Sequence, residues 1–231
     1  MTDNEDSPPK TPICVESVSD LCERILHIRT SAPKQRRVLI GIAGAPGSGK
    51  STLAESLPAL LDPVLAQHGE ASVVVPMDGF HLDNAVLDAH GLRAVKGSPQ
   101  TFDVAGFAHL LSRIAQRVEE TLYVPVFDRS MDLARNASQE VSKSHSVAIV
   151  EGNYLLLEQP GWCDLSDSFD CTIMLRVPLA TLESRLVQRW LDHGLTEDEA
   201  QHRALSNDIP NARTVLAESI PADLYYESVR Q

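Results

Sequence analysis

The chain has 231 residues, of which 43% are hydrophobic and 23% charged, and its formal net charge is -12. Its 12 glycines and 14 prolines form no repeat, which excludes a collagen-like or low-complexity chain, and the apolar fraction excludes a wholly disordered one. The acidic balance disfavours general attraction to nucleic acid or to anionic membrane surfaces. We therefore expect a globular protein that holds any polyanion at a local basic site.

The cysteines and the first residues favour a reducing cytoplasm. The four cysteines include no C-x-x-C pair, and the start MTDNEDSPPK is acidic where a signal peptide is basic and then apolar. No apolar run approaches the roughly 18 residues needed to span a bilayer. We expect a cytoplasmic protein with no membrane or nucleic-acid partner, and the oligomeric state stays open.

Three regions follow in chain order. Residues 1–12, with three prolines and no apolar periodicity, predict a disordered tail. Apolar residues recur at helical spacing over 14–30, and a basic stretch follows at 34–37, so 13–35 is predicted to form an N-terminal helix and linker. Residues 36–231 are then expected to form one domain.

Within that domain, short apolar runs alternate with longer helical patterns. Nearly uninterrupted Val, Ile and Leu predict strands buried on both faces at 38–43, 72–77, 146–150 and 171–177. A more polar run at 223–229 predicts an edge strand, and 123–127 another short strand. Helices are expected at 51–61, 104–119, 178–192 and 197–206, the last opened by a Thr196–Glu199 capping box. The pattern predicts an α/β fold with a mainly parallel, five-stranded sheet and a ligand site beyond the carboxyl ends of the strands.

A full match to the G-x-x-x-x-G-K-[ST] phosphate-binding pattern follows the first strand of this domain. Glycines let successive backbone N–H groups face one anion, and the next helix adds its positive end. Lys50 is expected to reach the outer phosphates, Ser51 to offer its hydroxyl to Mg²⁺, and Thr52 to contact the innermost phosphate. The predicted nucleotide-binding residues here are Gly44, Ala45, Pro46, Gly47, Ser48, Gly49, Lys50, Ser51 and Thr52.

Two carboxylates follow other predicted strands. Asp78 ends the run at 72–77 and is expected to accept a proton from an attacking hydroxyl or to orient it; the alternative is a turn before Gly79. His81 is either a substrate contact or an ordinary loop residue. Glu151 ends the run at 146–150, where a carboxylate can reach Mg²⁺; its alternative is also a turn residue.

Two loops mix hydrogen-bonding groups with an aromatic ring, a set that suits a sugar, a ribose or a carboxylated substrate. The alternative is a solvated loop with a buried phenylalanine. The candidate substrate contacts are Arg93, Lys96, Phe102 and Asp103 in one loop and Phe127 and Arg129 in the other.

The predicted helix at 178–192 carries Arg185 and Arg189 four residues apart, a spacing that suits a helical lid closing over phosphates. Their alternative is salt bridging to Glu183 or Asp192. If Arg185 acts mainly in the transition state, its removal lowers turnover more than nucleotide binding.

The order GAPGSGKS, PMDGFH, KGSPQTFD, VPVFDRS, VEGNYLLL, RLVQRW and SNDIPN resembles the P-loop kinase family of uridine kinase, bacterial pantothenate kinase and phosphoribulokinase, over about residues 36–228. The EGNYLLL and ND-x-x-N segments resemble most closely the bacterial fructose-transport-system kinases of that family. The resemblance implies a P-loop NTPase three-layer α/β/α sandwich with a helical lid, and ATP and Mg²⁺ as cofactors. It implies transfer of the ATP γ-phosphate to a small metabolite, most readily a sugar such as fructose.

The resemblance also assigns roles. It implies that Asp78 is the catalytic base, that Lys50 and Arg185 stabilise the transferring phosphoryl group, and that Ser51 and Glu151 hold the metal. Arg189 carries over as a lid residue. Asn207 and Asn211 fall where relatives place groups near the adenine.

The departures from this family bear on the acceptor. His81 and Phe127 stand where uridine kinases usually carry tyrosines, so two hydroxyls that would read uracil are absent. Pantothenate kinase resembles PMDGFH and KGSPQTFD more closely but is a longer protein. Uridine or another nucleoside, and pantothenate, therefore stay alternatives to a sugar.

Two other classes of protein remain as alternatives. A GTPase-type switch, which hydrolyses nucleotide without an acceptor, needs a guanine-reading N-K-x-D segment, and the chain has none. A binding protein that has lost catalysis is disfavoured by the intact Lys50, Ser51, Asp78 and Glu151.

Overall fold

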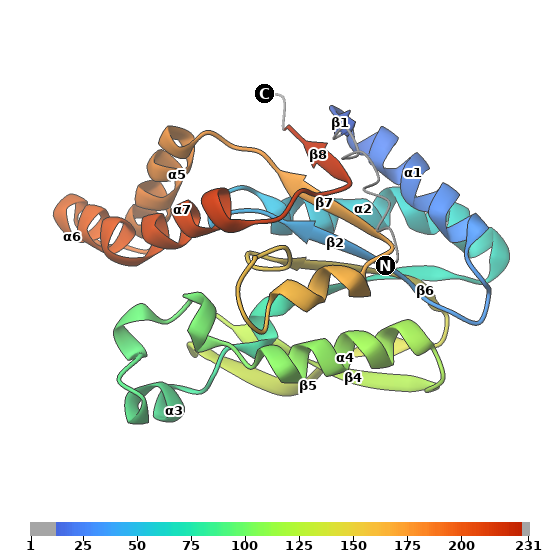
Figure 1. The fold of residues 1–231 in the computed structure, drawn as a ribbon, viewed down its shortest axis with the longest axis horizontal. Coiled ribbons are helices and arrows are strands. Elements are labelled where there is room, and N and C mark those ends of the chain that lie inside the picture. The colour runs from blue at the N-terminus through green and yellow to red at the C-terminus, as the bar shows by residue number, and fades with distance from the viewer. Residues whose placement is uncertain (1–12, 228–231) are drawn as a thin grey trace, which may run out of the picture.

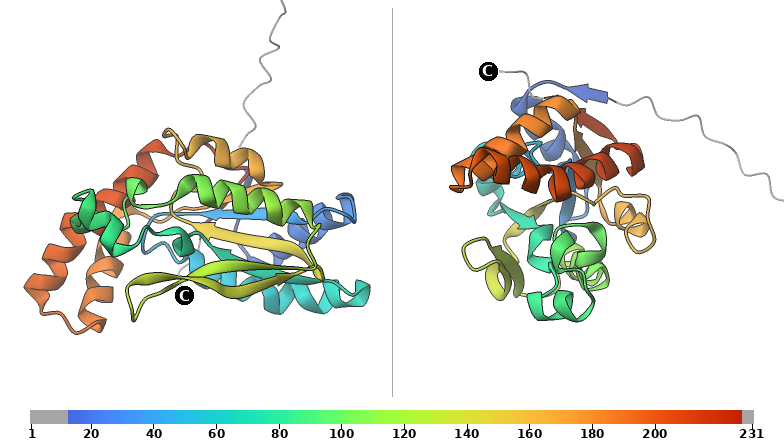
Figure 2. Two further views of the ribbon diagram at one scale, coloured as in Figure 1. Left: turned by 90° about the horizontal axis from the view of Figure 1, so that it is seen from below. Right: turned by 90° about the vertical axis from the view of Figure 1, so that its left-hand side faces the viewer.

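In the computed structural model, which describes residues 13–227, a six-stranded parallel sheet lies between two layers of helices (Figure 1). The strand order is β1-β8-β7-β2-β6-β3. A separate antiparallel hairpin, β4–β5, runs alongside (Figure 2). The strands are β1 Ile13–Val15, β2 Val38–Ala43, β3 Ala71–Pro76, β4 Thr121–Asp128, β5 Leu133–Ser142, β6 His145–Gly152, β7 Cys171–Leu175 and β8 Leu224–Tyr226. The helices are α1 Val18–Ser31, α2 Lys50–Leu65, α3 Asn84–Ala89, α4 Val104–Gln116, α5 Leu179–Asp192, α6 Glu197–Arg203 and α7 Ile209–Glu218.

The central strands are apolar throughout because each face of the sheet meets its own core. All six residues of β2 are buried, and its side chains alternate between the two cores. Leu39 joins the core formed with α4, α5 and α7, whereas Ile40 and Ile42 join the core formed with α1 and α2. This arrangement confirms the three-layer α/β/α fold with a mainly parallel sheet.

The count of five strands in this sheet was wrong, and so was the edge position of the last one. A helix was expected from residue 14, but Ile13–Val15 forms β1 and α1 begins at Val18. The Ser17 side chain caps this helix by accepting a hydrogen bond from the Asp20 N–H. Strand β8 lies between β1 and β7, so β1 and not β8 is the edge. Residues 1–12 and 228–229 lie outside the described residues.

The β4–β5 hairpin was predicted only as a short strand at 123–127. Most of the β5 side chains are polar and exposed or half-buried, so the sequence shows no buried-strand pattern there. The side-chain amide of Gln139 on β5 donates to the Val74 carbonyl on β3, 2.7 Å away. That bond attaches the hairpin to the edge strand β3.

Two predicted helix ends also moved. Helix α2 continues past residue 61 to Leu65, because Leu53, Leu57, Leu61 and Leu65 form one buried stripe. Helix α4 ends at Gln116, where Arg117 takes a left-handed conformation with φ 52°. No helix within residues 13–227 has both the length and the apolar character needed to cross a membrane.

The predicted helix at 197–206 is divided. Its Thr196–Glu199 capping box is confirmed, but α6 ends at Arg203 and passes through a π-helical turn, Ala204–Asp208, into α7. Pro210 has no N–H to donate to the preceding turn, and its ring crowds the carbonyl four residues back. The wider π turn is where the chain accommodates that proline.

The basic stretch predicted as a linker is partly buried. The Arg37 guanidinium is buried and donates to the backbone carbonyls of His145 (2.6 Å), Ser142 (3.0 Å) and Ile114. Burial, together with the smaller effect of the nearby Arg117 charge, lowers the pKa of Arg37 to about 10. Arg37 therefore joins the start of β2 to the end of α4 and to the β5–β6 turn.

Helix α1 is attached to the rest of the chain by a second buried arginine. Arg29 Nη2 lies 2.6 Å from Glu70 Oε1, and Arg29 Nε donates to Glu70 Oε2 at 2.9 Å, a bidentate pair. Arg117 lies 3.6 Å from the same carboxylate. These contacts hold the pKa of Glu70 well below its usual range, at about 2, chiefly through the hydrogen bonds from Arg29.

Glu70→Gln is therefore expected to destabilise the protein by about 2 kcal/mol at pH 7. Because the folded-state pKa lies below the unfolded one, this contribution is present above about pH 4.5 and is lost as pH falls toward 2. Urea unfolding of both proteins from pH 7 to pH 3 measures the difference. A gap that stays constant over this range would contradict the assignment.

Gly79 packs against the backbone of the β4–β5 hairpin. A Cβ added there would lie 2.3 Å from the Pro125 carbonyl oxygen and 2.7 Å from its carbon, both backbone atoms. The hairpin and the 3₁₀ turn Met77–Phe80 can therefore pack this closely only because residue 79 is a glycine.

Gly79→Ala is expected to cost about 2–3 kcal/mol of unfolding free energy, because the hairpin must move away from this turn. Gly91→Ala is the control: its φ is +68° and no atom lies within 4 Å of the added Cβ, so only backbone strain of about 1 kcal/mol is expected. Equal losses for the two variants in chemical denaturation would contradict the close packing at Gly79.

Candidate active site

The loop between β2 and α2 is shaped to receive an anion. Gly47 and Gly49 have φ values of +79° and +92°, a conformation that side chains with a Cβ rarely adopt. Helix α2 begins at Lys50 with no side-chain cap and no acidic residue in its first turn. Its first N–H groups and its positive dipole end are therefore available to a phosphate.

The order of the strands brings the functional side chains to one edge of the sheet. Strand β6 lies between β2 and β3, and Glu151 pairs in register with Ile42 on one side and Pro76 on the other. The loop after β2 therefore carries Lys50 and the turn after β3 carries Asp78 on either side of Glu151. Parallel strands all end at this edge, which is why the three groups meet.

Glu151 lies beneath the phosphate loop. The Ser51 hydroxyl donates to its Oε2 at 3.2 Å, and Lys50 Nζ lies 3.9 Å from the same oxygen. Burial raises the pKa of Glu151, an effect that the Lys50 charge partly offsets. Within residues 13–227 no three His, Cys, Asp or Glu side chains form a metal-binding group, whereas one hydroxyl and one carboxylate suit Mg²⁺ held mainly by nucleotide phosphates.

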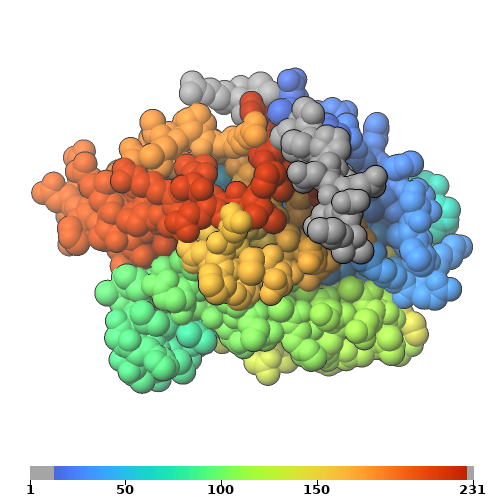
Figure 3. Space-filling model, in the orientation of Figure 1, coloured from blue at the N-terminus to red at the C-terminus, as the bar shows by residue number. Residues whose placement is uncertain are grey.

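A cleft of about 360 Å³ opens in front of this edge. The lid segment, α5 to α7, and the segment around α3 lie at the same end of the molecule, one above the other (Figure 3). The cleft is lined by residues of the phosphate loop, the turn after β3, the two predicted substrate loops and the lid helices. These residues are Pro46, Gly47, Gly49, Lys50, Ser51, Thr52, Asp78, His81, Arg93, Lys96, Gly97, Phe127, Arg129, Asp132, Asn153, Arg189, Trp190, Arg203, Asn207, Asp208 and Asn211.

Asp78 faces this cleft with a cation beside it. Arg129 Nη2 donates to Asp78 Oδ2 at 3.2 Å, from a side chain that is 69% exposed and so able to move. His81 Nδ1 lies 2.8 Å from the Asp78 carbonyl, which can only accept, so Nδ1 carries the hydrogen. Burial lowers the pKa of His81, and the neutral ring keeps Nε2 as an acceptor.

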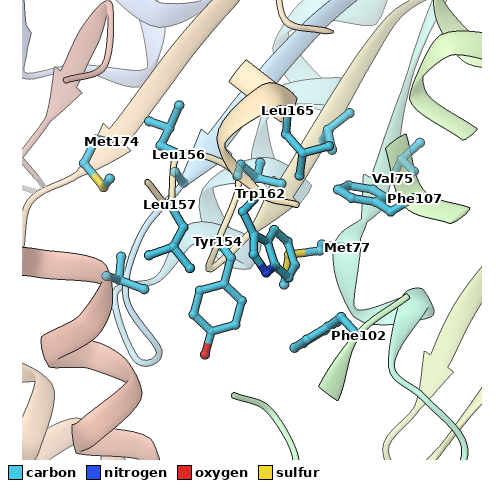
Figure 4. Close-up of a cluster of buried hydrophobic side chains, with 14 of the residues drawn as sticks. Val75, Met77, Phe102, Phe107, Tyr154, Leu156, Leu157, Trp162, Leu165 and Met174 are labelled. Atoms are coloured by element: carbon cyan, nitrogen blue, oxygen red, sulfur yellow. The ribbon is translucent and has the colours of Figure 1, made fainter. Parts of the chain in front are cut away.

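The wall of the cleft near Asp78 is a packed aromatic group. The His81 ring centroid lies 4.1 Å from that of Phe102 and 4.6 Å from that of Phe127. Phe102 makes edge contacts with Tyr154 and Trp162 in the core beneath (Figure 4). This group fixes the ring of His81 at the surface of the cleft.

Lys96 lines the cleft and connects two segments beside it. Its Nζ donates to Asn84 Oδ1 at 2.7 Å and to the Asp132 carbonyl at 2.6 Å, and it lies 3.0 Å from Asp132 Oδ1. The side chain is 9% exposed. Lys96 therefore joins α3 to the turn of the β4–β5 hairpin and leaves little of its charge for a ligand.

The two lid arginines occupy different places. Arg189 Nη2 donates to Asp208 Oδ2 at 3.0 Å inside the cleft. Arg185 is exposed and donates to the carbonyls of Gly47 and Ser48 at 3.3 and 3.5 Å. With Thr52 and Tyr226 it lines a second hollow of about 370 Å³ on the other side of the phosphate loop.

Several other predicted site residues lie outside the main cleft. Phe102 is buried under His81, and Asp103 caps α4 by accepting from the Gly106 N–H at 2.9 Å. Gly44, Ala45 and Ser48 form the inner side of the phosphate loop and do not line the cleft, and Ser48 lines the second hollow. Asn207 and Asn211 do line the cleft, where Asn207 meets the predicted substrate loop: its amide donates to the Lys96 carbonyl at 2.8 Å.

The sequence reasoning missed several lining residues. Asn153, Trp190 and Asp208 belong to the quoted segments EGNYLLL, RLVQRW and SNDIPN, so those segments held the signal. Asp132 enters from a hairpin turn and Arg203 from a lid helix, and no motif marks them. Only the fold brings these two to the cleft.

Comparisons with known proteins agree with this geometry. No protein-family model matches the chain. A solved structure from Silicibacter sp. TM1040, described as a "putative fructose transport system kinase", has a TM-score of 0.84 and 47% identity over 91% of this chain and 99% of that chain. "Uncharacterized protein YggC" of Escherichia coli is 36% identical over 222 residues, which are 94% of this chain and 90% of that protein.

A eukaryotic relative matches over the same length. "Putative uridine kinase C227.14" of Schizosaccharomyces pombe is 33% identical over 222 residues, 94% of this chain and 92% of its own. In this structure the phosphate loop follows β2, Asp78 follows β3, and Glu151 lies near the end of β6. The chain belongs to the family of P-loop kinases that includes uridine kinase, pantothenate kinase and phosphoribulokinase.

Proposed function

We propose that this kinase transfers the γ-phosphoryl group of ATP to a hydroxyl of a small sugar, with fructose as the favoured acceptor. One observation carries the proposal: Asp78 and the phosphate loop face the same cleft from two strands on either side of β6. A carboxylate there can accept the proton of a hydroxyl that attacks the outer phosphate.

The groups that would bind ATP and Mg²⁺ come from the phosphate loop, from β6 and from the lid. Lys50 and the N–H groups at the start of α2 would bind the outer phosphates. Ser51 and Glu151 would hold Mg²⁺, which would neutralise charge on the transferring group. Arg189, and Arg185 after closure of α5, would add positive charge from the lid.

The nucleoside part of ATP would lie in the second hollow. Gly49 and Thr52 line both spaces, so a nucleotide whose outer phosphates occupy the cleft can continue past Thr52 into this hollow. Its walls include the exposed Arg185 and the ring of Tyr226, which can pack against a planar base.

The acceptor side of the cleft favours a small polyhydroxylated molecule. His81 offers an acceptor, Arg129 a donor and Asp78 a carboxylate in the part of the cleft that the half-buried Phe127 also lines. Sugars present apolar C–H faces and several hydroxyls, which suit such a set. The structure from Silicibacter sp. TM1040, whose description names fructose transport, supports the same choice.

An assay of ADP release over fructose, other sugars, uridine and pantothenate tests the proposal. Fructose, or another sugar, is expected to give the highest kcat/KM. A higher value for uridine or pantothenate would contradict the sugar assignment. ATP hydrolysis that no acceptor accelerates would contradict acceptor phosphorylation and favour the nucleotide-hydrolysing switch.

Asp78→Asn is expected to lower kcat by about 10²–10⁴-fold, because the amide has nearly the same shape but cannot accept the proton. The Kd for Mg·ATP should change little, since Asp78 lies on the acceptor side. Asp164→Asn, the same substitution in the exposed turn Cys163–Ser168, is the control and should retain full activity. Wild-type turnover in Asp78→Asn would remove Asp78 from the mechanism.

A further inference from the structure

The π-helical turn Ala204–Asp208 carries two adjacent side chains that reach different parts of the cleft. Asn207 is buried and Asp208 is half-buried, although both carry polar groups. Each finds partners outside its own helix, Asp208 on the lid and Asn207 on a substrate loop. Turns of this type in a helix often occur at functional sites.

Asp208 binds the lid. Its Oδ2 accepts from Arg189 Nη2 at 3.0 Å and from Trp190 Nε1 at 2.6 Å, and its side chain is only 13% exposed. These are neighbouring residues on α5, the helix that also carries Arg185. The ion pair holds Arg189 at the cleft while leaving it within reach of a stronger anion, because a phosphate offers more charge and more acceptor oxygens than one carboxylate.

Asn207 binds the other side of the cleft. Its amide donates to the Lys96 carbonyl at 2.8 Å, and the Asn211 amide donates to Asn207 Oδ1 at 3.3 Å, which fixes the orientation of Asn207. We call residues 96–101 the acceptor loop. Tyr154 secures the same loop from the core, since its hydroxyl donates to the Gly97 carbonyl at 2.7 Å.

The acceptor loop then reaches Asp78 through the hairpin. Lys96 accepts at its carbonyl from Asn207 and donates from Nζ to the carbonyl of Asp132, in the turn that also carries Arg129. Arg129 in turn donates to Asp78 Oδ2. Hydrogen bonds, the Lys96 side chain and the backbone of the 129–132 turn therefore connect Asn207 to the group beside the proposed base.

We propose that Asn207 and Asp208 are positioning residues that couple the capture of nucleotide phosphates by Arg189 to the placement of the acceptor loop. When phosphates draw Arg189 from Asp208, the π turn loses one of the two hydrogen bonds that Asp208 accepts from α5, and Asn207, one residue away, transmits the change to Lys96. Asn207 acts on the acceptor side and not at the adenine. The inference rests on the proposed function, because it requires a nucleotide in the cleft.

Amide hydrogen exchange tests this coupling without an identified acceptor. The Ser98 N–H donates to the Val95 carbonyl, the Thr101 N–H to the Ser98 carbonyl and the Gly97 N–H to the Thr101 hydroxyl, so exchange over 96–101 reports the order of the loop. Mg·AMP-PNP binding, measured in parallel by calorimetry, is expected to change exchange in this loop at least threefold in the wild-type protein. In Asn207→Ala the loop should exchange faster and lose its response, while AMP-PNP affinity changes less than threefold.

Two further variants make the test decisive. Asn207→Asp keeps the shape but not the donated hydrogen, so it should reproduce the effect even if Asn207→Ala is too unstable to measure. Ser206→Ala, an exposed residue of the same turn, is the control and should behave like the wild type.

Binding of AMP-PNP with no change over 96–101 in the wild type would overturn the coupling and leave the proposed function untouched. A more than tenfold loss of AMP-PNP affinity in Asn207→Asp, with normal exchange in the loop, would place Asn207 on the nucleotide and also overturn it. If Mg·AMP-PNP does not bind at all, the proposed function and the coupling both fail.

Discussion

The parallel pairing of β6 between β2 and β3 is the constraint on which the site depends. It fixes Glu151 opposite Ile42 and Pro76, so the phosphate loop and Asp78 must emerge on either side of one buried carboxylate. Strands β2 and β6 are buried on both faces, so a register shift of one residue would move each apolar side chain from one core to the other. The same shift would move the Glu151 carboxylate away from the phosphate loop. The chemistry of the site and the packing of the sheet are thus fixed by the same contacts.

Glu151 shows how that arrangement is balanced. Burial disfavours its charge and raises its pKa, while Lys50 at 3.9 Å and the Ser51 hydroxyl at 3.2 Å favour the charge. A divalent cation beside the nucleotide phosphates would favour it further. The carboxylate is therefore poorly stabilised in the free protein and best stabilised with its ligands present, as expected of a group retained for binding and not for folding.

The sequence predicted the parts of the fold that local patterns determine. Nearly uninterrupted apolar runs predicted β2, β3, β6 and β7, and G-x-x-x-x-G-K-[ST] predicted the loop between β2 and α2. It missed β5, whose polar residues form a strand only because β4 lies beside them, and β1, which is too short for a pattern and is held by β8. Asn207 and Asn211 were singled out only by the family resemblance, which placed them near the adenine; the partner of Asn207, the Lys96 carbonyl, comes from 111 residues away and no local signal shows it.

The charges of the cleft explain how so acidic a chain can hold a polyanion. Arg129, Lys96 and Arg189 pair with Asp78, Asp132 and Asp208, so much of the cleft's positive charge is already neutralised before a ligand arrives. A phosphate that draws Arg189 from Asp208 replaces one ion pair with another. Part of the free-energy cost of desolvating Arg189 has then already been met when the protein folded. An arginine that moves to a ligand also leaves its former carboxylate partner without an ion pair. At Asp78 that carboxylate is the proposed base, so movement of Arg129 toward an acceptor would expose the base when the acceptor is in place.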